Sequence, residues 1–438
     1  MRIACLHVPQ LSLQCATRVD PSLRGAPVAV VGAAERSSQL LARALGAPIV
    51  LACSRAAWAL GVRLGMTATS ARALSPVLEI VCAEVAGERE TARAIADALL
   101  AITPTVELGG RVGAGGAHLA MYVEVPTGRS KMRPTGWRGQ AFGERVIELL
   151  AGLGLSGRVG IADDRFTAWV AAAYGPDKHV HDGDEHGVVV VPRGGSAPFL
   201  APRPLALLAI PPEVQHMLEA LGVTSLGQFA ALPAPSVARP IEADYQALAR
   251  GDSGATLRPH VPDGPIREEL IVRGGNVLDS ASGVSGPAAI AMLARRVELR
   301  LAGRGRTAAR LDVRVGEREV PVELSRPVSE AAELARVLAP AISEANGAAW
   351  RLVVTISGEA IAGEAEAIVH GTSRAAEAVT TDPLAVVLAT SGSLDLRPWS
   401  LTSDVRAERR DVHRRTRRGK QRRGRPTPAA QSRLFERG

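Results

Sequence analysis

One ordered run of secondary-structure signals constrains the fold of this chain more than any other feature of the sequence. A buried strand, an amphipathic helix, a hairpin with a glycine-rich turn, a second amphipathic helix and a short strand follow one another. They are expected at residues 1–8, 88–102, 105–125, 140–153 and 159–162. Apolar residues at three- and four-residue spacing indicate the helices. This order is typical of a ferredoxin-like α+β sheet, with residues 20–75 inserted after the first strand.

Composition places this sheet inside a larger, multidomain chain. At 438 residues the chain is too long for one compact core, and a 46% hydrophobic content with only 3% aromatic residues predicts cores built from Ala, Val and Leu. No apolar run approaches the roughly 18 residues of a membrane span, and we expect no secretory signal and no membrane partner. The four cysteines show no C-x-x-C spacing, which favours reduced thiols in a cytoplasmic protein.

The second half of the chain divides into three parts. Residues 204–250 are expected to be helical, and a Pro/Gly-rich link over 254–265 leads to a second α/β unit over 266–390. Eleven Arg or Lys residues face only two carboxylates between Arg406 and Arg425. This basic, polar composition predicts that residues 391–438 form a disordered tail.

Five segments resemble the UmuC/DinB-type Y-family of translesion DNA polymerases. In chain order they are CLHVPQLSL (5–13), DPSLRGAPVAVV (20–31), GVRLGM (61–66), GIADDRF (160–166) and LGVTSLGQF (221–229). The first is most similar to the ImuB-like branch of that family. The resemblance implies a right-hand architecture with a ferredoxin-like palm, small fingers, a helical thumb and an α/β little finger. The corresponding ranges are 1–19 with 76–164, then 20–75, 165–253 and 266–390.

The carboxylates that this family uses to bind magnesium have no counterpart here. Aligned on the segment 20–31, the first two positions fall on His7 and Pro9 in the first strand. The second pair, which the family places before an Ala-Tyr-Leu-Asp-like run, falls on Leu119 and Ala120, before MYVE (121–124) in the hairpin. Two-metal phosphoryl transfer requires carboxylates that converge on one spot, and the first nineteen residues contain no Asp or Glu. The resemblance therefore implies a catalytically defective homologue with no catalytic residue, no metal and no cofactor.

The alternative is an active translesion polymerase whose metal site has been rearranged around Glu107 or Glu124. Glu124 shares a strand face with Ala120 but lies four residues further on, about 13 Å away at roughly 3.3 Å per residue. That distance is too great for one metal pair. Glu107 lies on the neighbouring strand of the expected hairpin and is the other local candidate.

The nucleotide-binding positions implied by the resemblance have changed as well. Ser12 stands where these polymerases place a bulky aromatic residue that screens the sugar. Arg55 and Trp58 stand where a Tyr and an Arg grip the triphosphate. Arg165 matches a phosphate-contacting Lys and retains its positive charge, so it is a candidate phosphate contact.

Arginines in the expected little finger indicate contact with the DNA backbone. Arginine–phosphate contacts give affinity without sequence preference. The candidate contacts are Arg295, Arg296, Arg300, Arg304, Arg306, Arg310 and Arg314. A histidine-rich stretch at 179–186 lacks zinc spacing, and the glycines at 113–116 are not followed by Gly-Lys-Ser/Thr; we interpret them as a polar loop and a hairpin turn.

The tail contains a peptide that resembles the Gln-x-x-Leu-Phe motif by which bacterial polymerases dock on the sliding clamp. Gln431 would anchor one end, while Leu434 and Phe435 would fill an apolar cleft. The resemblance further implies an adaptor in damage-induced mutagenesis that binds primer-template DNA, the sliding clamp, an error-prone C-family DNA polymerase and a RecA-like accessory protein. A third hypothesis is a general nucleic-acid-binding protein that acts mainly through its basic tail.

Overall fold

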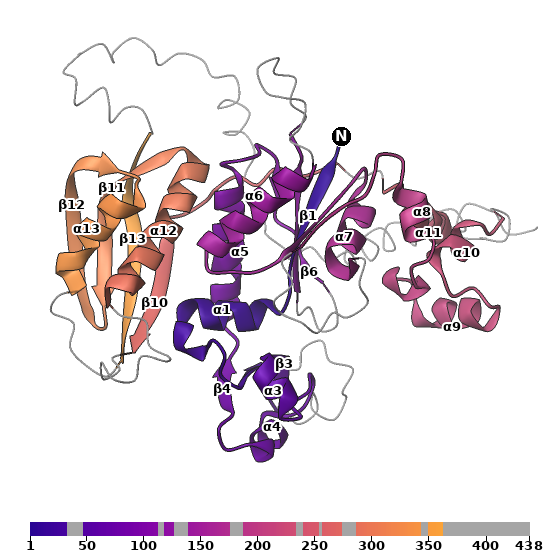
Figure 1. Ribbon diagram of the computed structural model, residues 1–438, viewed down its shortest axis with the longest axis horizontal. Coiled ribbons are helices and arrows are strands. Elements are labelled where there is room, and N and C mark those ends of the chain that lie inside the picture. Colours follow the sequence, from indigo (N-terminus) through magenta and orange to yellow (C-terminus); the bar gives the residue numbers. More distant parts are fainter. Residues whose placement is uncertain are drawn as a thin grey trace, which may run out of the picture.

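The computed structural model describes residues 1–32, 47–112, 118–126, 139–175, 187–233, 240–253, 256–273, 286–342 and 349–361. The stretch 179–186, the glycines 113–116 and the tail from 391 lie outside these residues. The described chain is a mixed α+β protein with three sheets (Figure 1). The multidomain α+β fold class expected from the sequence is therefore confirmed.

The largest sheet has the expected ferredoxin-like core. Its strand order is β5-β7-β1-β8-β9, with β1 antiparallel to both β7 and β8, β8 parallel to β9, and β6 paired to β7. These strands are β1 (Ile3–Val8), β5 (Val106–Glu107), β6 (Arg111–Val112), β7 (His118–Glu124), β8 (Arg158–Ala162) and β9 (Gly187–Val190). Without β6 and β9, the order β5-β7-β1-β8 is that of a ferredoxin-like sheet.

Helices cover the two faces of this sheet unequally. The apolar face, which includes Leu6 and Val8, packs against helices α1 (Leu11–Val19), α5 (Val85–Leu99) and α6 (Gly139–Gly152). The opposite face is covered by α7 (Arg165–Tyr174) over Cys5, Tyr122 and Ala162. The close approach of α7 requires Gly160, because a Cβ there would lie 2.2 Å from the carbonyl oxygen of Ala168. We refer to this sheet with α1, α5, α6 and α7 as the central unit.

Two smaller parts extend from the central unit. A three-stranded sheet of order β3-β2-β4 carries two short helices. Its elements are η1 (Pro21–Leu23), β2 (Val28–Gly32), β3 (Ile49–Cys53), α3 (Arg55–Ala59), α4 (Ala68–Leu74) and β4 (Glu79–Cys82). Short helices follow β9 and pack on α7 through a shared core. They are α8 (Ser196–Leu200), η3 (Leu205–Leu207), α9 (Pro212–Ala220), α10 (Leu226–Ala230) and α11 (Pro240–Arg250).

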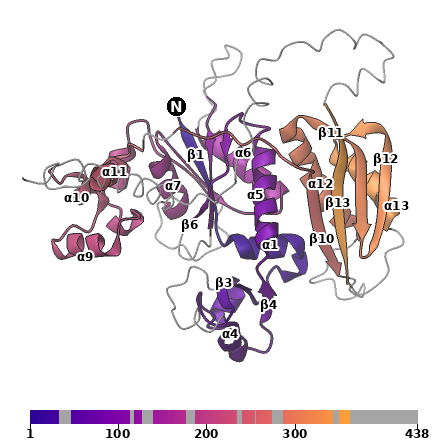
Figure 2. The same cartoon turned by 180° about the vertical axis from the view of Figure 1, so that it is seen from behind.

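The last described part is a four-stranded antiparallel sheet with two helices on one face, here called the four-stranded unit. Its strand order is β10-β13-β11-β12. It consists of β10 (Arg267–Arg273), α12 (Gly286–Arg304), β11 (Arg306–Val315), β12 (Arg318–Val328), α13 (Ala331–Ile342) and β13 (Ala349–Ile361). The four-stranded unit and the short helices α8–α11 lie at opposite ends of the molecule, with the central unit between them (Figures 1 and 2).

No helix in the described ranges is long and apolar enough to cross a membrane.

Candidate nucleic-acid interface

Strands β1 and β7 bring near one another the four positions that the resemblance aligns with the carboxylates of the family. His7 lies opposite Ala120, and Val8 lies opposite Leu119. Leu119 points into the core beneath the helices α5 and α6, whereas Ala120 is on the other face with Cys5 and Tyr122. Pro9 follows directly after β1. The four positions are thus neighbours along the chain and across the two strands, although Leu119 and Ala120 face opposite sides of the sheet, and their side chains are an imidazole, a proline ring and two apolar groups.

A pair of histidines occupies this spot. The His7 and His118 rings lie 5.0 Å apart between centroids, and Nδ1 of His118 accepts a hydrogen bond from the Gln10 N–H at 3.2 Å. His7 is only 4% exposed. Burial, with the nearby His118 and Arg158, lowers the pKa of His7 to about 3, and burial also lowers the pKa of His118. Both imidazoles are therefore neutral at neutral pH.

The depressed pKa of His7 predicts an acid-dependent loss of stability. The unfolded chain takes up a proton near pH 6.5, but the folded chain resists it down to about pH 3. The unfolded state then binds more protons, so the free energy of unfolding falls as pH drops from 6.5, by up to about 1.4 kcal/mol per pH unit. The variant His7→Gln should show a shallower slope between pH 6.5 and 5 in urea denaturation.

The exposed His216 on α9 supplies the control for this titration. The variant His216→Gln should keep the slope of the unmodified protein, because it removes an exposed imidazole and leaves the buried His7 in place. An unchanged slope in His7→Gln would contradict a neutral buried imidazole at this position.

Glu107 is engaged in an internal ion pair. Its Oε1 lies 2.5 Å from Nη2 of Arg165, and its Oε2 accepts the Arg258 N–H at 2.9 Å. The Arg165 guanidinium also lies over the Tyr122 ring, 4.1 Å from the centroid. Although burial alone would lower it, Tyr122 and Glu107 hold the pKa of Arg165 above its usual value. Both oxygens of Glu107 are therefore occupied, and the charge of Arg165 is balanced within the protein.

Glu124 lies away from the histidine pair. It is opposite Ile3 at the far end of β7, and its Oε2 accepts a hydrogen bond from the Thr105 hydroxyl at 3.4 Å. In the described part of the chain, no group of three or more His, Cys, Asp or Glu side chains is placed to hold a metal ion.

The remaining nucleotide-binding positions have other partners or surroundings. The buried Ser12 hydroxyl donates a 2.5 Å hydrogen bond to Glu88 of α5. Trp58 lies on α3 of the three-stranded sheet, where the Arg63 guanidinium stacks over its ring at 4.0 Å. Arg55 begins the same helix. Ser12 therefore contributes to packing of α1 on α5 rather than to a sugar-screening surface.

The structure corrects the prediction for three of the seven arginines. Arg296 and Arg300 are 1% and 0% exposed, and the side chain of Arg304 is 7% exposed. All three lie on the face of α12 that packs against the central unit, where burial lowers the pKa of Arg296 to about 9. They contact protein groups, so they cannot contact DNA in this arrangement. The acidic partners of this cluster, Asp97 and Glu268, were not predicted from the sequence.

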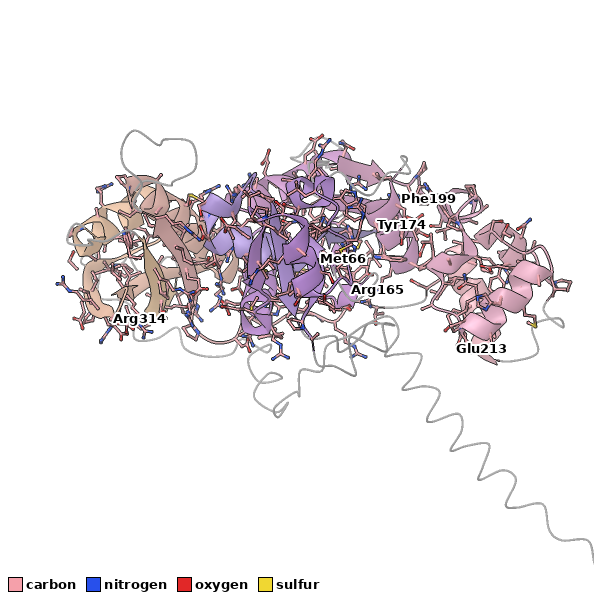
Figure 3. All side chains as sticks on the ribbon, turned by 90° about the horizontal axis from the view of Figure 1, so that it is seen from below. Met66, Arg165, Tyr174, Phe199, Glu213 and Arg314 are labelled. Atoms are coloured by element: carbon pink, nitrogen blue, oxygen red, sulfur yellow. The ribbon has the colours of Figure 1, made fainter. Side chains whose placement is uncertain are left out.

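The other arginines are exposed. Arg310 and Arg314 point from β11 to the sheet face that carries no helix, Arg306 begins that strand, and Arg295 lies on α12. On the open face, Arg310 lies 3.6 Å from Glu323 and Arg314 lies 3.5 Å from Glu319. Figure 3 shows Arg314 on the four-stranded unit, well separated from Arg165 in the central unit. The structure therefore does not bring Arg165 and the exposed arginines together.

Comparison with known proteins agrees with this architecture. Residues 8–173 match the impB/mucB/samB family. The chain is 26% identical over 318 residues to Protein ImuB of two Caulobacter vibrioides strains, a match that covers 69% of this chain. The chain spans 62% of the length of these curated relatives.

Solved structures of polymerases are also similar. An insertion ternary complex of Dbh DNA polymerase is 14% identical, with 82% of this chain and all of that chain covered and a TM-score of 0.45. DinB from Sulfolobus solfataricus is 15% identical, with 81% and 98% covered and a TM-score of 0.43. Over residues 8–173 this chain is therefore similar to the impB/mucB/samB family, and over 69% of its length it is similar to the ImuB proteins.

Proposed function

We propose that this chain is a non-catalytic, DNA-binding adaptor in damage-induced translesion synthesis. In this proposal the central unit corresponds to the palm, the three-stranded sheet to the fingers, the helices α8–α11 to the thumb and the four-stranded unit to the little finger. The observation that carries it is the neutral His7–His118 pair at the former metal site. Glu107 adds further support. Both of its carboxylate oxygens already have protein partners, which argues against Glu107 as a ligand of a relocated metal site.

The loss of the carboxylates also changes how DNA can approach. A cluster of unshielded carboxylates repels a phosphate backbone unless magnesium is bound. Neutral imidazoles at His7 and His118 remove that repulsion, so DNA binding by this chain needs no divalent cation. DNA binding without a divalent cation therefore distinguishes the adaptor from the active-polymerase alternative, in which metal binds between the carboxylates and the substrate.

The DNA contact is assigned to the open face of the four-stranded unit. On β11, Arg310 precedes Asp312 by two residues and Arg314 follows it by two, so the two arginines are about 13 Å apart along the strand. Their ion pairs with Glu323 and Glu319 are solvent-exposed, and such pairs are worth only about 0–1 kcal/mol. Phosphates of a DNA strand can therefore displace these carboxylates at little energetic cost.

We expect the double variant Arg310→Ala/Arg314→Ala to bind primer-template DNA several-fold more weakly. Each lost phosphate contact lowers the slope of log K against log salt by about 0.9, so the slope should fall by nearly 2. The measurement is fluorescence anisotropy from 50 to 200 mM NaCl, with EDTA in one series and magnesium in another. The two series should agree after correction for ionic strength.

Matched variants make this test specific. Arg336→Ala removes an exposed arginine from α13, on the helical side of the same unit, and should leave the affinity and the salt slope unchanged. A chain without residues 406–425 should retain most of its affinity. If that deletion abolishes binding while the double variant does not affect it, the tail-only hypothesis is correct and this surface is not the DNA contact.

The proposal for the tail concerns the sliding clamp. Leu434 and Phe435 supply two apolar anchors next to the polar Gln431, the combination expected of a short peptide that fills a cleft. The basic residues 406–425 would act as a tether between this peptide and the DNA-binding units. A separate error-prone C-family polymerase and a RecA-like accessory protein complete the proposed assembly. Replacing both apolar anchors by Ala should remove clamp binding and leave DNA binding intact.

A further inference from the structure

Helix α12 is buried on two sides. One side, with Leu293, Val297 and Leu301, belongs to the core of its own four-stranded unit. The other side carries Arg296, Arg300 and Gly303, which recur at three- and four-residue spacing and therefore share a helix face. This second face packs against α5 of the central unit. Helix α12 thus links the two units: one face packs in the core of its own unit, and the other packs against the central unit.

The two helices approach so closely that the contact requires a glycine. A Cβ on Gly303 would lie 1.7 Å from the carbonyl oxygen of Asp97 and 2.7 Å from its carbonyl carbon. Both atoms belong to the backbone of α5, so neither can rotate away as a side chain can. At the first residue of the same helix, a Cβ on Gly286 would meet nothing within 4 Å. Any residue other than glycine at 303 therefore forces the two units apart.

Two acidic groups in this contact are surrounded by arginines. Asp97 of α5 accepts a 3.0 Å hydrogen bond from Nε of Arg300, and its Oδ2 lies 2.9 Å from Nη2 of Arg304. Glu268 of β10 lies 3.1 Å from Nη1 of Arg300 and 2.5 Å from Nη2 of Arg18 on α1. The side chains of Asp97 and Glu268 are 1% and 0% exposed. These distances are those of charge-assisted hydrogen bonds.

The exchange of charge is reciprocal. The central unit supplies Asp97 and Arg18, and the four-stranded unit supplies Glu268 and Arg300. Each unit therefore contributes one carboxylate and one guanidinium to ion pairs with the other unit. If the units separated or slid by one helical turn, Asp97 and Arg18 of the central unit would lose their charged partners on the four-stranded unit while still partly buried, which is strongly unfavourable. A contact of this kind has one register, whereas an apolar contact tolerates several.

Although burial alone would raise them, the surrounding groups hold the carboxyl pKa values low. His260, Arg300 and Arg304 keep the pKa of Asp97 below its usual value, and Arg18 and Arg300 do the same for Glu268. Both acids are therefore charged at neutral pH. A second ion pair, between Arg273 of β10 and Asp20, lies at 2.5 Å on the edge of the same contact.

We infer that Asp97 and Glu268 are positioning residues for DNA binding: they lock the four-stranded unit onto the central unit before DNA arrives. The open sheet face with Arg310 and Arg314 then has the same orientation in the free protein as in the DNA complex. The inference rests on the proposed DNA binding for its functional consequence, whereas the lock itself is a property of the free protein.

The lock is tested by distance measurement in the full-length protein. Spin labels are placed on cysteines introduced at the exposed Glu144 of α6 and the exposed Arg336 of α13, with Cys82→Ser to remove the exposed native thiol. Double electron–electron resonance is recorded without and with primer-template DNA. We expect one narrow distance distribution that DNA does not shift. A broad distribution in the free protein that becomes narrow only with DNA overturns the inference.

Variants connect the lock to binding. Gly303→Ala and the isosteric Asp97→Asn should broaden the distribution, whereas the matched Gly286→Ala should not. Because only the docked fraction presents the binding face, the apparent Kd should rise in inverse proportion to that fraction, about twofold when half the molecules are undocked. Should Gly303→Ala fail to fold, as judged by circular dichroism, Asp97→Asn carries the test. A distribution that stays narrow in folded Asp97→Asn also overturns the inference.

The two readouts separate the possible failures. A narrow, DNA-independent distribution with no measurable DNA binding leaves the lock intact and removes the proposed function. DNA binding that persists unchanged while the Asp97→Asn distribution broadens removes the positioning role of Asp97 and leaves the proposed function standing.

Discussion

Purified protein given a primed template, all four dNTPs and either magnesium or manganese is expected to add no nucleotide. Phosphoryl transfer needs two metal ions held between converging carboxylates. In the antiparallel pair of β1 and β7, this chain has His7 opposite Ala120. Burial lowers the pKa of His7 to about 3, so its ring is neutral at the pH of the assay. The measurement is gel-resolved primer extension, with a sliding clamp added to parallel lanes.

Three variants show how a contrary result would be interpreted. If extension occurs and disappears in Glu107→Ala or Glu124→Ala, the active-polymerase alternative is correct and the metal site has moved. Glu144→Ala removes an exposed acid from α6 and serves as the matched control, since it should leave any extension unchanged. Extension that survives all three substitutions would indicate a contaminating polymerase.

The variant Arg300→Met is expected to lower the free energy of unfolding by about 3–5 kcal/mol, the usual cost of removing one partner from a buried ion pair. The substitution fills most of the volume of Arg300 but leaves Asp97 and Glu268 without their shared cation. Urea denaturation followed by circular dichroism measures the effect. Because the chain has several units, loss of the contact between the two units should appear as an unfolding transition separate from that of the remaining protein.

The control for this prediction is Arg336→Met on the exposed side of α13. A surface substitution of this kind should change the free energy of unfolding by less than about 0.5 kcal/mol. If Arg300→Met costs no more than Arg336→Met, the buried charges do not stabilise the contact. Replacing Arg300 and Asp97 together by apolar residues should cost less than the single change, since Glu268 then keeps Arg18 and Arg304 keeps Glu359 as a partner.

The central sheet could be predicted from the sequence because its signals are local and periodic. The helices expected at 88–102 and 140–153 correspond to α5 at Val85–Leu99 and α6 at Gly139–Gly152. Helix α1 was not predicted. Its cap residue Gln10 has a left-handed φ of 45° and makes no side-chain cap hydrogen bond, so none of the usual helix-start residues marks its beginning.

The buried arginines show what local pattern cannot reveal. Arg296, Arg300 and Arg304 follow a four-residue spacing that is also typical of a solvated helix face. Their burial depends on Asp97, which is 203 residues away from Arg300 in the sequence. One local signal did exist: Asp97 interrupts the apolar stripe of the helix at 88–102, and a buried acid requires a cationic partner. The sequence alone could not say which cation that is.

The open face of the four-stranded unit also has a consequence for how long DNA would stay bound under the proposed function. Its arginines stand beside their own carboxylates: Arg310 beside Glu323, and Arg314 beside Glu319. These acids compete with phosphate for the same guanidinium groups, so a DNA strand that leaves is replaced at once by an internal ligand. Under the proposed function, such a surface would exchange its DNA rapidly, and a primer end held there would remain free to pass to another enzyme.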